Sequence, residues 1–366
     1  MRLTAIVSAL EALAPRALQE KWDNSGLQVS LPADADGEVT GVMLCVDVTP
    51  EVIAEAVAAG CNMVISHHPL IFKGLKGLCG RTVAERAVAA AVRAGVAVYS
   101  AHTSLDSAIG GVSYEMARRL SDDLRIRRVL VPTDMPLVQV RVTCARADAD
   151  DLRLAILDNA ATDSLMSWNV QGNVLEVTDG DDGVPFAGIA AKECTTLVTV
   201  VPAMNTGAVR EAIDGFCARF TPRVRLTMLD GHPDGYGLGV VADFGTPVTM
   251  ETLRGMAAAA FAPVFRASRA GADDSRTVRR VALCGGAGGE FIGAAIAAGA
   301  DAYITADVRY HDFCDHGSDI AIFDVGHFES EKCAKDIFFR ALTKKFPNFA
   351  VHYSHSVNPV QYIIQK

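Results

Sequence analysis

The sequence lacks the marks of several protein classes. No apolar run in its 366 residues approaches the roughly 20 residues of a membrane-spanning helix. The start, Met1-Arg2-Leu3-Thr4, leads into a predicted amphipathic helix without the apolar core and cleavage site of a signal peptide. Nine cysteines are scattered without a C-x-x-C motif, which argues against a disulfide framework and a thiolate metal site. We therefore expect a cytoplasmic globular protein with no membrane partner.

Positive charge is also scarce. The chain has 34 Lys and Arg against 43 Asp and Glu, which gives a formal net charge of -9. Because an acidic chain is a poor partner for a nucleic-acid backbone, we expect no nucleic acid to bind. The densest basic cluster, Arg125, Arg127 and Arg128, is interpreted as a solvated loop. Half of the residues are hydrophobic, which suits buried cores and the interfaces of a homo-oligomer.

The chain is too long for one typical core, so we expect more than one domain. Strands alternate with helices in residues 1–129 and again in 271–366, which predicts the α/β fold class. Between them, residues 130–270 twice show the order strand, helix, strand, which suits an inserted α+β module of ferredoxin-like type. We expect the two flanking segments to form one two-lobed domain that carries the chemistry.

A histidine pair follows the strand predicted at 63–65. His67 and His68 leave the carboxyl end of that strand, where open α/β sheets usually bind ligands. Adjacent side chains on extended backbone diverge, so the two imidazoles are better placed to hold one ion each than to chelate one ion together. The alternative is a chance histidine pair in a polar loop.

Further polar groups follow other predicted strands. His102 and Asp106 follow the strand at 96–100, and His327 and Glu331 follow the strand at 320–324. Because His327 and Glu331 are four residues apart at the head of a helix predicted to run to about 345, they share one helix face. If these strands form one sheet, five groups converge on its edge, which predicts a metal site formed by His67, His68, Asp106, His327 and Glu331.

Nitrogen and oxygen ligands without thiolate leave Zn, Mn, Fe and Ni open. Two carboxylates among five ligands can bridge, which favours two divalent ions per chain. A glycine-rich turn at 285–289 precedes a helix and is able to offer N–H groups to an anion, although it lacks a complete nucleotide-binding motif. The polar turn at 21–29 is interpreted either as a turn with Gly26 at positive φ or as part of the site.

These segments together resemble the GTP cyclohydrolase I type 2 homologue family, the Nif-three-like dinuclear metal-centre proteins. The matching motifs lie in both flanking segments, in order: Lys21–Leu27, Ser66–Leu70, Ala101–Asp106, the turn at 285–289, Thr305–His311, Gly326–Glu331 and Asn358–Tyr362. The resemblance implies a two-lobed fold, a middle domain similar to the signalling protein PII and a toroidal homohexamer. It also implies that the five residues named above bind the metals.

Two functions follow as hypotheses. The first is a metal-dependent hydrolase that acts on a nucleotide-like or phosphorylated small molecule. In this hypothesis His311 and His102 are the acid–base candidates, and Asp307 orients an imidazole through its second N–H group. The second is a metal-binding or regulatory hexamer without turnover, which binds a small ligand or a partner through its middle domain.

Overall fold

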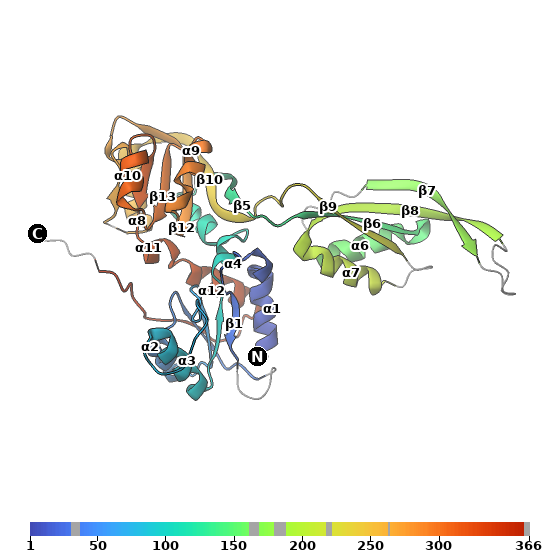
Figure 1. Cartoon of the computed structure of the whole chain (residues 1–366), viewed down its shortest axis with the longest axis horizontal. Helices are drawn as coiled ribbons and strands as arrows, with labels where there is room; N and C mark the ends of the chain where they lie inside the picture. The colour runs from blue at the N-terminus through green and yellow to red at the C-terminus, as the bar shows by residue number, and fades with distance from the viewer. Residues whose placement is uncertain (31–36, 161–167, 179–187, 217–221, 263, 362–366) are drawn as a thin grey trace, which may run out of the picture. The chain divides into compact units, whose positions relative to one another are not determined.

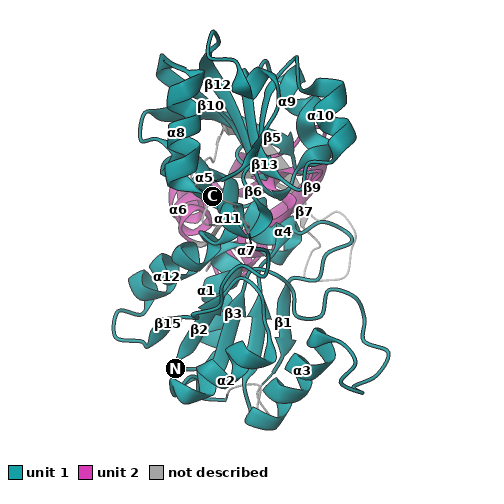
Figure 2. Cartoon of the chain, turned by 90° about the vertical axis from the view of Figure 1, so that its left-hand side faces the viewer, with its two compact units in different colours: residues 1–133, 234–366 teal, residues 134–233 magenta. Residues whose placement is uncertain are grey.

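The computed structural model describes residues 1–30, 37–160, 168–178, 188–216, 222–262 and 264–361. The chain divides into two compact units (Figures 1 and 2). Unit 1 contains residues 1–133 and 234–366, and unit 2 contains residues 134–233. No helix in these described ranges is long and apolar enough to cross a membrane.

The first sheet of unit 1 has the order β1-β4-β3-β2-β15. Its strands are β1 (Gly26–Val29), β2 (Val42–Cys45), β3 (Met63–Ser66), β4 (Ala97–Ser100) and β15 (Val351–Tyr353). The inner strands run parallel, as the strand-helix-strand pattern predicted, and only β1 is antiparallel to its neighbour. Every residue of β2, β3 and β4 is buried, as expected for strands covered on both faces.

Helices α2 (Pro50–Ala58) and α3 (Val83–Ala94) pack on this sheet and share an apolar core with it. Each begins at a threonine whose hydroxyl accepts a backbone N–H bond, Thr49 for α2 and Thr82 for α3. Helix α3 ends at Gly95, which has a φ of 65° and can adopt this left-handed conformation because it lacks a Cβ. Local sequence signals therefore set the bounds of both helices.

The second sheet of unit 1 has the order β11-β14-β13-β12-β10-β5. Its strands are β5 (Leu124–Pro132), β10 (Gly237–Thr249), β11 (Arg266–Ala267), β12 (Thr277–Ala287), β13 (Ala302–Ala306) and β14 (Ala321–Asp324). Strands β12, β13 and β14 are parallel, and the other neighbours are antiparallel. The helices of this half are α5 (Val112–Leu120), α8 (Met250–Ala260), α9 (Ile292–Ala297) and α10 (Tyr310–His316).

Two elements of this sheet differ from the sequence-based interpretation. The cluster Arg125, Arg127 and Arg128 lies on β5 and not in a loop, and Arg127 forms an ion pair of 3.0 Å with Asp243 of β10. Strand β10 contains several glycines and a proline, which are unusual in strands, so the sequence did not indicate it. Because β10 pairs with β5 and β12, residues 237–260 belong to unit 1 rather than to the segment 130–270 expected as the insertion.

Unit 2 is a four-stranded antiparallel sheet with two helices. Along the chain it contains β6 (Leu137–Ala145), α6 (Ala149–Ala160), β7 (Trp168–Thr178), β8 (Gly188–Pro202), α7 (Thr206–Asp214) and β9 (Arg223–Leu229). The strand order is β7-β8-β6-β9. Alternate residues of β6, Val138, Val140 and Val142, are buried in a core shared with both helices.

Candidate metal centre

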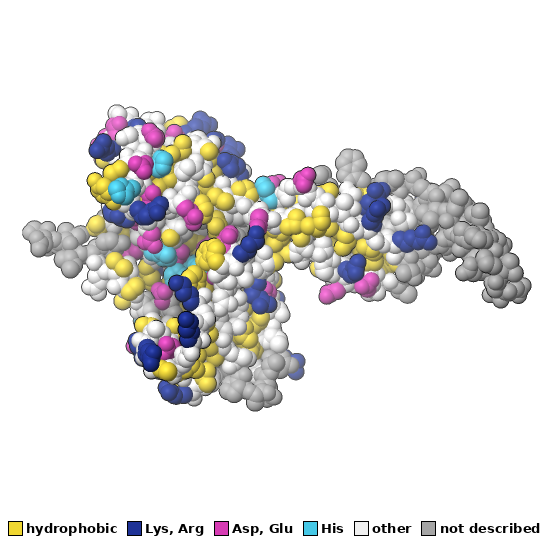
Figure 3. Space-filling view, viewed as in Figure 1, with side chains coloured by type: hydrophobic (Ala, Val, Ile, Leu, Met, Phe, Trp, Pro, Cys, Tyr) yellow, Lys and Arg dark blue, Asp and Glu magenta, His cyan; other side chains and the backbone are white. Residues whose placement is uncertain are grey.

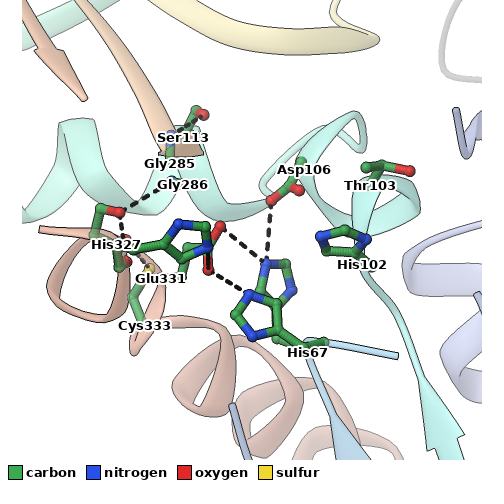
Figure 4. A network of polar contacts seen from close by, with 12 residues as sticks. His67, His102, Thr103, Asp106, Ser113, Gly285, Gly286, His327, Glu331 and Cys333 are labelled. Atoms are coloured by element: carbon green, nitrogen blue, oxygen red, sulfur yellow. Dashed lines mark hydrogen bonds and ion pairs between the residues drawn. The ribbon is translucent and has the colours of Figure 1, made fainter. Parts of the chain in front are cut away.

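All five predicted ligands lie together in unit 1. His67 and His68 directly follow β3, and Asp106 ends the short helix α4 (Thr103–Asp106) after β4. His327 and Glu331 lie at the two ends of α11 (His327–Glu331), which follows β14. Figure 4 shows Glu331 between His327 and His67, with Asp106 also directed at His67.

The sequence suggested that all five candidate ligands follow strands of one sheet, but they come from two sheets. Strand β14 pairs with β13 and β11, whereas β3 pairs with β2 and β4, so the two groups meet across the interior of unit 1. The helix predicted from 327 to 345 is also divided into α11 and α12 (Ala334–Lys345). Histidine and acidic side chains gather on the face of unit 1 that Figure 3 shows.

Glu331 is the centre of the cluster. Its Oε2 lies 2.8 Å from His68 Nε2 and 3.1 Å from His327 Nε2. Its Oε1 lies 3.6 Å from His67 Nε2, and the same nitrogen lies 3.6 Å from Asp106 Oδ1. The other four groups therefore divide over the two oxygens of Glu331, with His68 and His327 on one side and His67 and Asp106 on the other.

Each imidazole is oriented through its other ring nitrogen. His67 Nδ1 lies 2.9 Å from the Ala101 carbonyl oxygen, and His68 Nδ1 lies 2.7 Å from Asp47 Oδ1. His327 Nδ1 lies 2.7 Å from Asp307 Oδ2. An acceptor at Nδ1 fixes a proton there, so Nε2 is the nitrogen that faces the centre and would bind a metal once deprotonated, as in metal-binding histidines.

Two buried atoms of the cluster fit a metal ion. His67 Nε2 and Asp106 Oδ1 are both buried and have no hydrogen-bond partner among the described residues. Buried polar atoms are almost always satisfied, so an unsatisfied pair in facing positions needs a ligand. His67, His68 and Glu331 each offer one ligand atom, and these three atoms lie within 4.8 Å of one another. The residues present therefore fit a divalent cation.

Two imidazoles beside Glu331, those of His68 and His327, have raised pKa values that favour their charged forms. Burial opposes a charge on His68, but hydrogen bonds to Asp47 and Glu331 prevail and raise its pKa to about 10. Burial likewise opposes a charge on His327, whereas Glu331 and Asp307 raise its pKa to about 9. An ion that binds these nitrogens must displace their protons, so metal binding is coupled to proton release.

The pKa values of the two buried carboxyl groups shift in opposite directions. For Asp106, burial raises the pKa to about 7, with the His67 ring opposing the rise and Glu331 adding to it. For Glu331, burial is outweighed by its imidazole neighbours, His67 foremost, and the pKa lies well below its usual range. The negative charge of the site is therefore concentrated on Glu331.

Asp307 and Asp47 support the cluster from outside. Asp307 follows β13 and has a φ of 53°, an uncommon conformation for a residue with a Cβ, while its carboxylate bonds to His327. This is the orienting role predicted for Asp307 from the sequence. Asp47 was missed, although it follows β2 as the other site residues follow their strands, so the same rule would have found it.

His102 forms a second arrangement beside the cluster. Its ring centroid is 5.5 Å from those of His67 and His68, and its Nδ1 lies 2.8 Å from Asp23 Oδ1. The buried Asp23 carboxylate also accepts bonds from Thr103 N, 3.0 Å away, and from Thr103 Oγ1, 2.5 Å away. Burial opposes its charge, but the bonds from His102 and Thr103 hold the pKa of Asp23 well below its usual range. The polar turn around Asp23 is therefore part of the site.

The glycine-rich turn serves packing. Gly285 N donates to Ser113 Oγ and Gly286 N donates to Ser330 Oγ, so neither N–H group is available to an anion (Figure 4). Gly286 has a φ of 64°, and a Cβ there would lie 2.1 Å from Glu331 Oε1. Glycine at this position lets the end of β12 approach the centre of the cluster.

His311 is exposed on α10, with its ring centroid 5.5 Å from that of Tyr310. No contact among the described residues joins its side chain to the five candidate ligands. Two cavities flank the cluster, one of about 370 Å³ lined by His68 and Asp47 and one of about 380 Å³ lined by His327 and Asp307. Their size suits a small molecule.

Similar proteins have been described in several bacteria. The chain is 31% identical over 342 residues to the "GTP cyclohydrolase 1 type 2 homolog" of Mycobacterium tuberculosis, covering 90% of this chain and 88% of that one. It is 29% identical over 351 residues to the Bacillus subtilis protein of the same name, covering 92% and 91%.

Solved structures share the fold. A Bacillus cereus protein related to NIF3 matches with a TM-score of 0.82 and 25% identity over 99% of both chains. A Staphylococcus aureus protein has a TM-score of 0.71 and 24% identity over 99% of both chains. A family model matches residues 1–359, almost the whole chain. The chain therefore belongs to the Duf34/NIF3 (NGG1p interacting factor 3) family.

Proposed function

We propose that the protein is a dinuclear metal-dependent hydrolase that acts on a nucleotide-like or phosphorylated small molecule. The observation that carries the proposal is the division of His67, Asp106, His68 and His327 over the two oxygens of Glu331. Two divalent ions bound there would lower the pKa of a coordinated water and polarise the bond to be cleaved. The nitrogen and oxygen donors suit Zn, Mn, Fe or Ni.

His102 is the proposed general base and acid. Because its Nδ1–H donates to Asp23, its Nε2 carries the lone pair and is able to accept a proton from the attacking water. The Asp23 carboxylate stabilises the imidazolium that forms and keeps the ring in this tautomer. His102 then returns the proton to the leaving group. Asp23 acts through His102 and is a positioning residue.

Asp307 and His311 have lesser proposed roles. Asp307 orients His327 through its Nδ1 and lines the cavity of about 380 Å³ next to it. Arg266 lines the same cavity, where its guanidinium pairs with Asp324 and donates to the Val308 carbonyl oxygen, and its remaining N–H groups are proposed to bind a phosphorylated substrate. His311, which is exposed on α10, is proposed as an acid–base group only for a substrate large enough to reach that helix.

The assembly is proposed to be a homohexamer, as the family resemblance implies. Unit 2 is proposed to be a PII-like, ferredoxin-like module, because its order of strands and helices is β-α-β-β-α-β with the sheet order β7-β8-β6-β9.

The test is turnover by metal-reconstituted protein on a panel of nucleotides and phosphate esters. We expect His102→Ala to lower kcat by about 100-fold or more, the usual contribution of a general base, with the metal content unchanged. Asp23→Asn should lower kcat and alter its pH profile, because an amide in place of the carboxylate favours the other tautomer of His102. Fully metal-loaded protein with only background rates on the whole panel would favour the non-catalytic, regulatory hexamer instead.

A further inference from the structure

Two exposed aromatic side chains stand beside the metal centre and take no part in the chemistry above. Trp22 and Phe72 have ring centroids 5.9 Å apart, and their centroids lie 6.0 and 6.1 Å from that of His102. His102 in turn contacts the rings of His67 and His68. A continuous group of rings therefore leads from the candidate ligands to the surface.

The outer two rings are unusually accessible. Trp22 is 60% exposed and Phe72 is 45% exposed. Single exposed apolar residues are common, but two adjoining aromatic rings at the rim of a polar centre form a surface with an affinity for another ring. Interplanar angles of 71–82° among the three rings leave their faces turned in different directions.

The backbone that carries these rings is held in place. Asn24 Nδ2 donates to the Ile71 carbonyl oxygen over 2.6 Å, and Ile71 N donates to Gln28 Oε1 over 2.7 Å. These bonds join the segment of Trp22 to the segment of Phe72. Because the backbone that carries both rings is already fixed, only the side-chain torsions lose freedom when a ligand binds, which favours stacking on the pair.

Charge next to the rings indicates the kind of ligand. Lys73 directly follows Phe72 and is exposed, and its long, flexible side chain is able to bring an ammonium group to an anion beside the rings. A planar ring that carries a negative group would meet an aromatic face and a cation together. We propose that Trp22 and Phe72 form a stacking platform for the heteroaromatic ring of an anionic, nucleotide-like substrate whose reacting group lies at the metal centre.

A second copy of this chain is the competing occupant. A stable protein interface buries about 800 Å² on each partner, whereas one aromatic side chain supplies on the order of 200 Å². Two rings next to a buried polar cluster are therefore a better match for one bound ring than for an interface.

The experiment measures binding without turnover. The chain has two tryptophans, so metal-loaded protein with Trp168→Phe retains Trp22 as its fluorophore. We expect GMP to quench this fluorescence and to bind at least tenfold more tightly than ribose 5-phosphate, which has the anion but no base. Phe72→Ala in that background, and Trp22→Ala measured by calorimetry, should each weaken GMP binding about tenfold and leave ribose 5-phosphate unaffected. Trp22→Phe should restore most of the affinity.

The matched control is Leu78→Ala, which removes an apolar side chain 58% exposed in the segment that follows Phe72 and should change nothing. Equal affinities for GMP and ribose 5-phosphate, or no GMP binding at millimolar concentration, would overturn the platform. So would a fall in molecular mass by light scattering in Trp22→Ala, since the rings would then be an interface. The placement of the reacting group at the metal centre rests on the proposed function, but the experiment distinguishes the failure of one proposal from that of the other. GMP binding that depends on the rings, without any hydrolysis, would support the platform and refute the hydrolase. Hydrolysis that is unchanged in Trp22→Ala would support the hydrolase and refute the platform.

Discussion

Glu115 offers a quantitative test of how unit 1 is held together around the cluster. Its carboxylate, on α5, forms ion pairs with Arg118 at 2.6 Å and Arg119 at 3.1 Å of the same helix, and with Arg340 of α12 at 2.7 Å. Helix α5 packs on β12 of the second sheet, and α12 packs on β2 of the first. One buried carboxylate, 3% exposed, therefore connects elements from both halves of unit 1.

The magnitude follows from the pKa of this group. Burial would raise the pKa of Glu115, but hydrogen bonds from Arg118, Arg340 and Arg119 prevail and lower it from 4.5 to about 2. At 1.36 kcal/mol for each pKa unit, the charged form contributes about 3 kcal/mol to the free energy of unfolding. Because the folded pKa is lowered, this contribution is complete above about pH 5 and falls to about 1 kcal/mol at pH 3.

We expect the substitution Glu115→Gln to lower the free energy of unfolding, relative to the parent protein, by up to about 3 kcal/mol at pH 7 and by about 1 kcal/mol at pH 3. Urea unfolding followed by Trp22 fluorescence in the Trp168→Phe background reports on unit 1 and not on unit 2. Glu251→Gln, an exposed glutamate in the first turn of α8, is the matched control and should stay within about 0.5 kcal/mol. An equal loss at both pH values would refute an electrostatic origin.

Two further predictions concern the insertion and the glycine-rich turn. Pro132 pairs with Gly237, so deleting residues 134–233 leaves a short hairpin loop between β5 and β10. The shortened protein should therefore fold and bind metal. A soluble but metal-free product would show that unit 2 helps to form the site. Gly286→Ala should abolish metal binding, measured by elemental analysis, because the new Cβ would overlap Glu331. Gly255→Ala, which has open space within α8, should instead keep the metal and gain about 0.5–1 kcal/mol; metal retained in Gly286→Ala would contradict the packing argument.

Most of the candidate site was predictable because ligand-binding side chains follow the carboxyl ends of strands. Each candidate ligand follows a short apolar strand, and such strands are readable from β-branched runs and flanking turn residues. The pairing of His68 with Glu331 spans 263 residues and depends on how two sheets pack, which no local pattern encodes. For that reason one sheet was expected where two occur.

Other features were missed because their local signals are ambiguous. Strand β10 has glycines and a proline that indicate a loop, and only its pairing with two neighbours makes it a strand. Asp23 lies in a segment with ordinary turn composition, and its role depends on its contact with His102, 79 residues away. The break between α11 and α12 likewise has no glycine or proline to announce it.

The measurement that tests the central claim most directly is the number of metal ions bound per chain. Elemental analysis of purified, reconstituted protein, combined with anomalous scattering at the cluster, should give two ions per chain, one on each side of Glu331. His67→Ala and His327→Ala should each lose mainly one of them. A ratio near one that falls to zero in either variant would contradict the dinuclear centre.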